Sequence, residues 1–115
     1  MRFYVSLFPG ARIDFLERYG ADGPGKEGTV FQGRCTLAGQ AVRFTDSFVK
    51  HDFTFTPAMS LFVDCADETE LDRLFEKLSV GGKVMMPPNN YGFSARFAWV
   101  ADRFGVSWQL NLPVQ

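Results

Sequence analysis

Apolar and polar residues alternate most regularly near the C-terminal end of the chain. From Val106 to Leu112 every second residue is apolar, and the residues between them are polar. A period of two places alternate side chains on opposite faces of a strand, so this segment predicts a half-buried β-strand. Strand-forming segments with turn residues between them predict further strands over residues 11–19, 29–37, 40–46 and 94–101.

A different period predicts one helix, which follows an apolar strand over residues 59–65. Asp67 lies three residues before Glu70, the spacing of a capping box, and Gly81-Gly82 predicts the end of the helix. Apart from Ser60 and Asp64 the strand before it is continuously apolar, which is typical of a strand that a helix covers. The apolar face of the helix repeats at i, i+3, i+4 and i+7 and consists of Leu71, Leu74, Phe75 and Leu78.

Shorter elements complete the prediction. Residues 2–8 predict a helix of about two turns, which Pro9-Gly10 ends. Residues 83–86 predict a short strand, and residues 87–90, with two prolines and two asparagines, predict a loop. Residues 47–57 predict a crossing linker.

The order of the predicted elements repeats. The second half reads strand, helix, strand, strand, strand, and the first half reads short helix, strand, strand, strand. We interpret this as an α+β fold of paired β-α-β-β-β modules that arose by internal duplication. Residues 1–57 form a first module that lacks its opening strand, and residues 58–115 form a complete second module. A chain of 115 residues has the usual size of a single domain, which we predict for the pair.

Composition and charge narrow the possible partners. Hydrophobic residues make up 46% of the chain, which includes 13 phenylalanines and predicts a globular protein with an aromatic interior. Twelve basic and thirteen acidic residues without a run of one sign argue against a nucleic-acid partner. The apolar stretches are too short to cross a membrane, and the N-terminal residues lack a secretory pattern, which favours the cytoplasm. Cys35 and Cys65 match no metal or redox spacing, so we expect free thiols.

Several short motifs cover essentially the whole chain: Tyr4-Val-Ser-Leu-Phe-Pro, Ser60-Leu-Phe-Val-Asp-Cys, Gly81-Gly-Lys-Val-Met-Met-Pro, Asn90-Tyr-Gly-Phe-Ser and Asp102-Arg-Phe-Gly-Val-Ser-Trp-Gln. Together they resemble one family. The chain resembles the PhnB-like branch of the vicinal oxygen chelate (glyoxalase/bleomycin-resistance/dioxygenase) superfamily. Members of this branch often carry a demethylubiquinone methyltransferase label, but no Gly-rich dinucleotide-type loop follows a first strand here to hold a methyl donor.

The resemblance implies a paired architecture and a dimer. In the superfamily two modules curl their sheets into a cleft, and members of this branch usually begin with one further strand. This chain starts within the following helix, so we expect either a start codon assigned too late or a shortened chain. An exposed sheet edge would then seek a partner, which together with the family predicts a homodimer.

The resemblance also implies a divalent metal in the cleft, held by His, Gln or Glu from several strands. This chain departs from that pattern, because the complete module offers Ser60 on its first strand and Gln109 where Glu is usual. His51 is the only histidine and lies in the linker near Asp46 and Asp52, where a solvated side chain is the ordinary role. We therefore favour no cofactor and no metal site, with His51 as a weak candidate if a divalent metal binds.

Candidate pocket residues follow from the strand faces. Ser107 and Gln109 lie on the face opposite Trp108, where they either line a pocket or form the polar face of an ordinary strand. Aromatic residues nearby suit an apolar or planar ligand, although core packing is the expected role of Phe97 and of Trp108. Asp102, Arg103 and Gly105 are expected to serve turn geometry. The candidates are Asp46, Ser60, Tyr91, Phe93, Trp99, Ser107 and Gln109.

Three functions remain open at this point, and no catalytic residue is assigned. The first is a protein that binds or sequesters a small molecule in a cleft between the modules. The second is a metal-dependent lyase, isomerase or dioxygenase, with the metal held by His51, Asp46 or Gln109. The third is a merely structural product of a late start.

Overall fold

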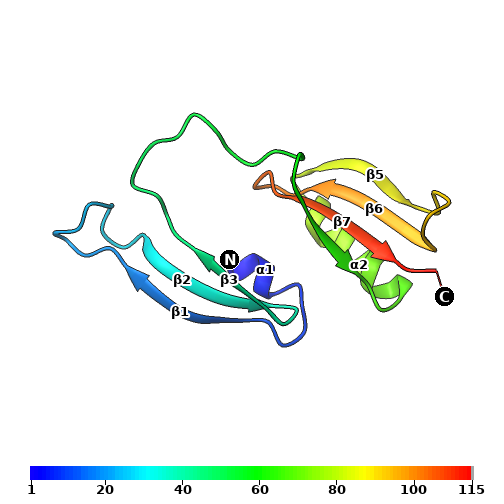
Figure 1. The fold of residues 1–115 in the computed structure, drawn as a ribbon, viewed down its shortest axis with the longest axis horizontal. Coiled ribbons are helices and arrows are strands. Elements are labelled where there is room, and N and C mark those ends of the chain that lie inside the picture. The colour runs from blue at the N-terminus through cyan, green and yellow to red at the C-terminus, as the bar shows by residue number, and fades with distance from the viewer. Residues whose placement is uncertain (115) are drawn as a thin grey trace. The chain divides into compact units, whose positions relative to one another are not determined.

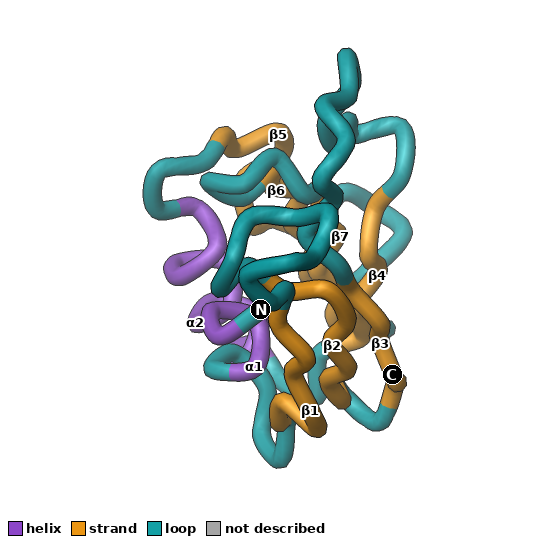
Figure 2. The backbone as a smooth tube through the Cα atoms, turned by 90° about the vertical axis from the view of Figure 1, so that its left-hand side faces the viewer, coloured by secondary structure: helices purple, strands orange, loops and turns teal. Residues whose placement is uncertain are grey.

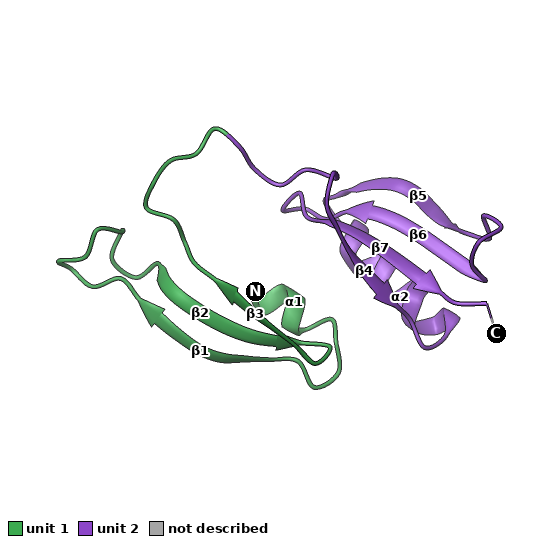
Figure 3. Cartoon of the chain, in the orientation of Figure 1, with its two compact units in different colours: residues 1–52 green, residues 53–115 purple. Residues whose placement is uncertain are grey.

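The computed structural model describes residues 1–114, which fold into two helices and seven strands (Figure 1). The chain divides into two compact units, Met1–Asp52 and Phe53–Gln115, and each is described by itself (Figure 3). Two sheets with few helices confirm the predicted α+β class. The union of both units in one domain stays a prediction. Within the described residues, no helix is long and apolar enough to span a membrane.

The first unit is a three-stranded antiparallel sheet preceded by a short helix. The hairpin between its second and third strands turns at Ala38 and Gly39, which both have positive φ, as the predicted tight turn requires. No counterpart of the opening strand of the second unit occurs among its described residues. Its elements are α1 (Arg2–Val5), β1 (Arg12–Arg18), β2 (Val30–Leu37) and β3 (Gln40–Phe44), with the strand order β1-β2-β3.

The helix α1 is shorter than the predicted two turns. The amide of Ser6 donates to the carbonyl oxygens of both Arg2 and Phe3, and the Ser6 hydroxyl also donates to the Phe3 oxygen at 2.5 Å. Such i→i−3 bonds tighten the last turn and end the helix before Pro9 is reached. The proline is therefore not the residue that ends α1.

The second unit is the predicted β-α-β-β-β module. Its first strand pairs in parallel with its last, and the other neighbours are antiparallel. The single long helix lies along one face of this sheet (Figure 2). Its elements are β4 (Ser60–Asp64), α2 (Glu68–Ser79), β5 (Lys83–Asn89), β6 (Arg96–Ala101) and β7 (Ser107–Leu112), with the strand order β4-β7-β6-β5.

The helix α2 begins and ends as its sequence predicts, and its apolar face builds the core. The Asp67 carboxylate accepts the amide of Glu70 at 2.8 Å, and Gly81 has a φ of +71° just beyond the helix. Burial of apolar side chains between helix and sheet supplies the main stabilisation of this unit. The core is formed by Leu71, Leu74 and Leu78 from the helix and by Ala98, Val100, Trp108 and Leu110 from the sheet.

The strand β5 corrects the prediction of a loop over residues 87–90. It continues through Pro87 and Pro88 to Asn89. Proline has no amide hydrogen, but β5 is an edge strand, and its register with β6 is irregular between Met86 and Asn89. Prolines are tolerated in strands under these two conditions, which the local sequence does not reveal.

A buried carboxylate fixes the turn between β6 and β7. Asp102 is 3% exposed, and its Oδ1 accepts the amides of Phe104 at 2.9 Å and Val106 at 3.1 Å. Its Oδ2 accepts the indole N–H of Trp108 at 3.0 Å. Gly105 has a φ of +89° in the same turn. Asp102 and Gly105 thus have the predicted turn role, and the turn sets the register of β6 against β7.

We predict that removing this carboxylate weakens the second unit. Asp102→Ala leaves the buried indole N–H and two turn amides without their acceptor, and each unsatisfied buried group costs about 1–3 kcal/mol. Asp102→Asn keeps one carboxamide oxygen and should lose less. Urea unfolding of both variants measures the difference, and equal stability of Asp102→Ala and the wild type would contradict the assignment.

Gly82 allows β5 to start close to this turn. A Cβ atom at Gly82 would lie 2.2 Å from the carbonyl oxygen of Ala101 and 3.0 Å from backbone atoms of Asp102. Because both neighbours are backbone, neither can move aside without shifting the β6–β7 turn. Only glycine fits at this position.

Gly82→Ala is therefore expected to lower the free energy of unfolding by about 1–3 kcal/mol, the usual cost of forcing an extra carbon into packed structure. Gly20→Ala is the matched control, because a Cβ atom at Gly20 meets nothing within 4 Å. Urea denaturation of the two variants gives the comparison. Similar losses for both variants would show that the close approach at Gly82 is unimportant.

Candidate functional site on the helix-free face

One face of the second sheet carries most of the residues that the sequence suggested. Side chains alternate along β6 and β7, and Val100, Trp108 and Leu110 point to the helix-covered core. The residues between them therefore point away from α2, together with their direct partners on β4. We call this surface the helix-free face, and it consists of Ser60, Phe62, Asp64, Phe97, Trp99, Ser107, Gln109 and Asn111.

Two serines form the first row of this face and bond to a tryptophan of the next row. The hydroxyl groups of Ser60 and Ser107 lie 2.6 Å apart, and the indole N–H of Trp99 donates to the Ser107 oxygen at 2.8 Å. Ser107 is buried, so its hydroxyl is committed to these two neighbours. Its role in the structure is to orient Trp99.

Gln109 occupies the middle of the face. It pairs with Phe62 on β4 and with Trp99 on β6, so an aromatic residue lies on each side of its amide. The side chain is half-buried and forms no hydrogen bond with another residue in the described part of the chain. An amide in this position can donate one hydrogen bond to a ligand and accept another.

A second polar row lies at the far end of the face. The Ser94 hydroxyl donates to the side-chain oxygen of Asn111, and the Asn111 amide donates to Asp64 Oδ1 at 2.9 Å. The two bonds fix the orientation of the Asn111 amide, because its oxygen and nitrogen have different partners. The Asp64 carboxylate is thereby held beside Asn111 and stays exposed.

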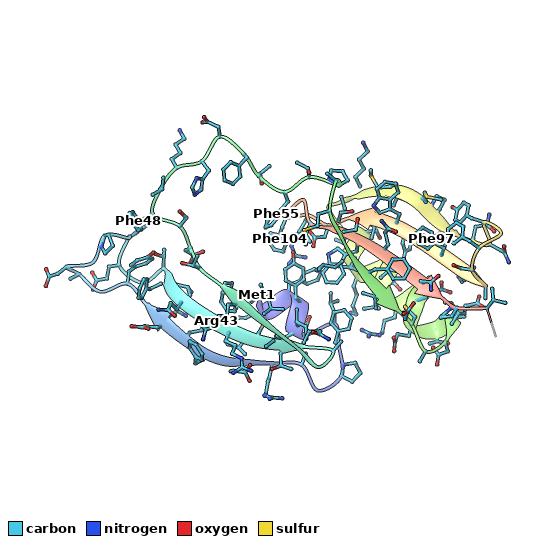
Figure 4. The ribbon with its side chains drawn as sticks, in the orientation of Figure 1. Met1, Arg43, Phe48, Phe55, Phe97 and Phe104 are labelled. Atoms are coloured by element: carbon cyan, nitrogen blue, oxygen red, sulfur yellow. The ribbon has the colours of Figure 1, made fainter. Side chains whose placement is uncertain are left out.

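Four aromatic rings gather at the same end of the face, around Phe97, which is labelled in Figure 4. The Phe97 ring lies at the centre, 4.9 Å from Phe93, 6.2 Å from Tyr91 and 6.4 Å from Phe62 between centroids. Phe97 is 4% exposed, as its predicted core role requires, whereas Phe62 is 57% and Phe93 60% exposed. We call these four residues the aromatic cluster.

The loop that carries Tyr91 and Phe93 is held in place by its own hydrogen bonds. The Tyr91 hydroxyl donates to the carbonyl oxygen of Pro87 at 2.5 Å, and Asn90 Oδ1 accepts the amide of Gly92 at 2.8 Å. Gly92 has a φ of +97°, which a larger residue rarely adopts. The rings of Tyr91 and Phe93 are therefore ordered beside Phe97 before any ligand arrives.

The structure thus brings six of the seven candidates together. Sequence reasoning missed Phe62, Asp64 and Asn111, because the parallel register of β4 against β7 is not visible in either segment alone. The spacing of Phe62 and Asp64 from Ser60, two and four residues along one strand, was the available signal. The six candidates at this face are Ser60, Tyr91, Phe93, Trp99, Ser107 and Gln109.

Asp46 and His51 belong to the other unit. The Asp46 carboxylate accepts the amide of Val30 at 2.8 Å, and its carbonyl oxygen accepts the Tyr19 hydroxyl at 3.1 Å. These bonds fasten the end of the first sheet. His51 Nε2 lies 3.1 Å from the Ser47 hydroxyl. Among residues 1–114, no group of three or more His, Cys, Asp or Glu side chains has the arrangement of a metal site.

Cavities occur away from the helix-free face. A cavity of about 380 Å³ lies at the start of α2 and is lined by Asp67, Glu68 and Leu112 among others. A second, of about 300 Å³, lies in the first unit and is lined by Met1, Ile13 and Phe44 among others. None of the pocket candidates lines either cavity, so their shared pocket stays a prediction.

Comparison with known proteins places the chain in a family. The sequence profile of the 3-demethylubiquinone-9 3-methyltransferase family matches residues 1–111. The chain belongs to this family. No curated protein matches it. The predicted PhnB-like resemblance is confirmed by this match and by the structures below.

Solved structures agree with this assignment. A PhnB protein from Bacillus cereus is 52% identical, with a TM-score of 0.94, over 97% of this chain and 87% of that chain. A protein from Pseudomonas aeruginosa is 24% identical with a TM-score of 0.82, over 97% and 85% of the two chains. TioX from Micromonospora is 16% identical with a TM-score of 0.52, over 97% and 84%. The last two show the shared fold alone.

Both cysteines are buried free thiols, as expected from their spacing. Burial raises the pKa of Cys65 from its ordinary 9.0 to about 11, and the negative charge of Glu70 adds to the shift. Burial also raises the pKa of Cys35. The thiolate is the reactive form, so neither side chain is suited to nucleophilic chemistry near neutral pH.

The Cys65 shift predicts a pH dependence of stability. The folded protein holds this proton more tightly than the unfolded chain, so the contribution is complete below pH 9.0 and is lost as the pH rises toward about 11. Urea unfolding from pH 8 to 11 should show a steeper loss for the wild type than for Cys65→Ala. The two proteins share every other ionisable group, so parallel curves would contradict the assignment.

Proposed function

We propose that this protein binds a small planar molecule on the helix-free face of its second sheet. The observation that carries the proposal is the amide of Gln109, which has no side-chain partner among the described residues and lies between Phe62 and Trp99. Ligand sites usually combine an apolar lining with a few polar groups that fix orientation. The aromatic cluster supplies the lining, and Gln109 supplies the orienting group.

The chemistry of these groups limits the class of ligand that fits this face. Aromatic side chains favour flat rings, which stack on them or meet them edge to face. The Gln109 amide favours a ligand with a carbonyl, hydroxyl or ring nitrogen. A quinone or phenol has both features, and the family description names a demethylubiquinone-type substrate. The proposal stops at binding, because the Gly-rich segment over residues 20–28 leads into the strand β2 and not into a helix, whose N-terminus such a loop needs to hold a cofactor.

The metal-dependent alternative has weaker support from these residues. Ser60, the candidate on β4, already shares a hydrogen bond with Ser107. Neutral hydroxyl and amide groups are poorer ligands for transition metals than imidazole, thiolate or carboxylate. Stoichiometric Ni, Zn, Fe or Mn in purified protein, lost in His51→Ala, would favour the alternative.

The proposal extends to a homodimer in the cytoplasm. The family resemblance supports the dimer, and two buried free thiols suit a reducing compartment. Sedimentation equilibrium of the purified chain tests the dimer.

The two tryptophans provide a direct test of binding. Trp99 lies on the helix-free face, whereas Trp108 is buried on the opposite, helix-covered side. Duroquinone is a suitable probe, because it is planar, quenches indole fluorescence and has no free ring position for thiol addition. We expect saturable quenching in the wild type and its loss in Trp99→Phe.

Gln109→Leu should weaken duroquinone binding about tenfold, the effect of one hydrogen bond of typical strength. Gln32→Leu is the matched control, because Gln32 is an exposed glutamine on β2 of the other unit. Absence of saturable quenching, or an equal effect of both substitutions, would overturn binding at this face.

A further inference from the structure

The Asp64 carboxylate lies at the end of the helix-free face that carries the aromatic cluster. We propose that this end binds a positively charged nitrogen, so that the ligand is a planar molecule bearing a substituted amine. The inference rests on the proposed function and adds the ligand's charge to it. The observation behind the inference is that an anchored carboxylate lies beside exposed aromatic rings.

The carboxylate is anchored through one oxygen. Asp64 Oδ1 accepts the Asn111 amide at 2.9 Å, and Asn111 is itself fixed by Ser94. Within residues 1–114, no hydrogen bond or ion pair to Asp64 Oδ2 is present. The second oxygen therefore remains available to a cation.

The neighbouring rings attract the same charge. Phe62 lies two residues before Asp64 on β4, so both side chains leave the strand on the helix-free face. The Phe62 ring lies 6.4 Å from Phe97, across the strand that carries Asn111. The face of an aromatic ring is negative and attracts ammonium groups, which is why rings and carboxylates together recognise substituted amines.

The basic residues of this sheet do not neutralise Asp64. Arg96 lies on the same, helix-covered face of β6 as Ala98 and Val100, and it pairs with Glu68 and Asp72 of α2. Lys83 is paired with Ala101, in the row of Ser60 and Ser107 at the opposite end of the face. Four strand residues separate that row from Asp64, which is about 13 Å.

The rows also set a distance between the two recognition groups. Gln109 and Asn111 are two residues apart on β7, and Asp64 pairs with Asn111. Two strand residues span about 7 Å. Asp64 also lies one strand to the side of Gln109, about 4.8 Å across the sheet, so the ligand carries its oxygen or ring nitrogen about 8 Å from its cationic nitrogen.

Three probes that share a naphthalene ring and differ in charge test the inference. They are 1-naphthylmethanol, which is neutral, trimethyl(1-naphthylmethyl)ammonium, which is cationic, and 1-naphthylacetate, which is anionic. Calorimetric titration of the full chain should show the cation binding about five- to tenfold more tightly than the alcohol, and the anion more weakly. The preference should shrink at 0.5 M salt, because the contact is partly exposed.

Asp64→Asn should abolish the preference for the cation and leave binding of the alcohol unchanged, because the new amide oxygen can still accept from Asn111. Asp22→Asn, an exposed aspartate in the first unit, is the matched control and should keep the preference. Phe62→Leu should weaken binding of the cation more than binding of the alcohol. Asp64→Ser provides a second variant if the asparagine variant is unstable.

The outcomes separate this inference from the proposed function. Equal binding of cation and alcohol to the wild type, or an unchanged preference in both Asp64 variants, would overturn the charged-nitrogen site while binding at Gln109 stands. Failure of all three probes and of duroquinone to bind would overturn both proposals. Loss of the preference in Asp64→Asn with retained alcohol binding would support both.

Discussion

The buried carboxylate of Asp102 is the interaction on which the second unit depends. It gathers two amides of the β6–β7 turn and the indole of Trp108, so it joins the turn to the core. The turn then fixes which residue of β7 lies beside which residue of β6. A slip of one residue would move every side chain of β7 to the other face. Trp108 would leave the core, and Gln109 would enter it.

The residues from Asp102 to Gln109 therefore fall into two sets with different roles. Asp102, Gly105 and Trp108 build the turn and the helix-covered core. Ser107 and Gln109 face the other way, where the first orients Trp99 and the second is open to a ligand. A short sequence can therefore be characteristic of a family for structural reasons and still position a binding surface.

Much of this arrangement follows from local sequence. Strict alternation in β7 and the capping residues of α2 predict both elements and the two faces of the final strand. Non-local information was needed elsewhere: Pro87 and Pro88 indicate a loop until β5 is known to be an edge strand. The parallel partner of β4 is equally invisible, because its register depends on residues more than 40 positions away. Asp64 and Phe62 were missed as site residues for that reason.

The two prolines of β5 have a consequence for the behaviour of the protein at high concentration. Exposed sheet edges recruit strands from other molecules, which leads to fibre-like aggregates. Successive amides of a strand point to opposite edges, so one of the two prolines removes a donor that an incoming strand needs, and polymerisation is disfavoured along this border of the sheet. The carbonyl of Pro87 is meanwhile taken by the Tyr91 hydroxyl. One proline pair thus both terminates the sheet and holds a ring of the aromatic cluster.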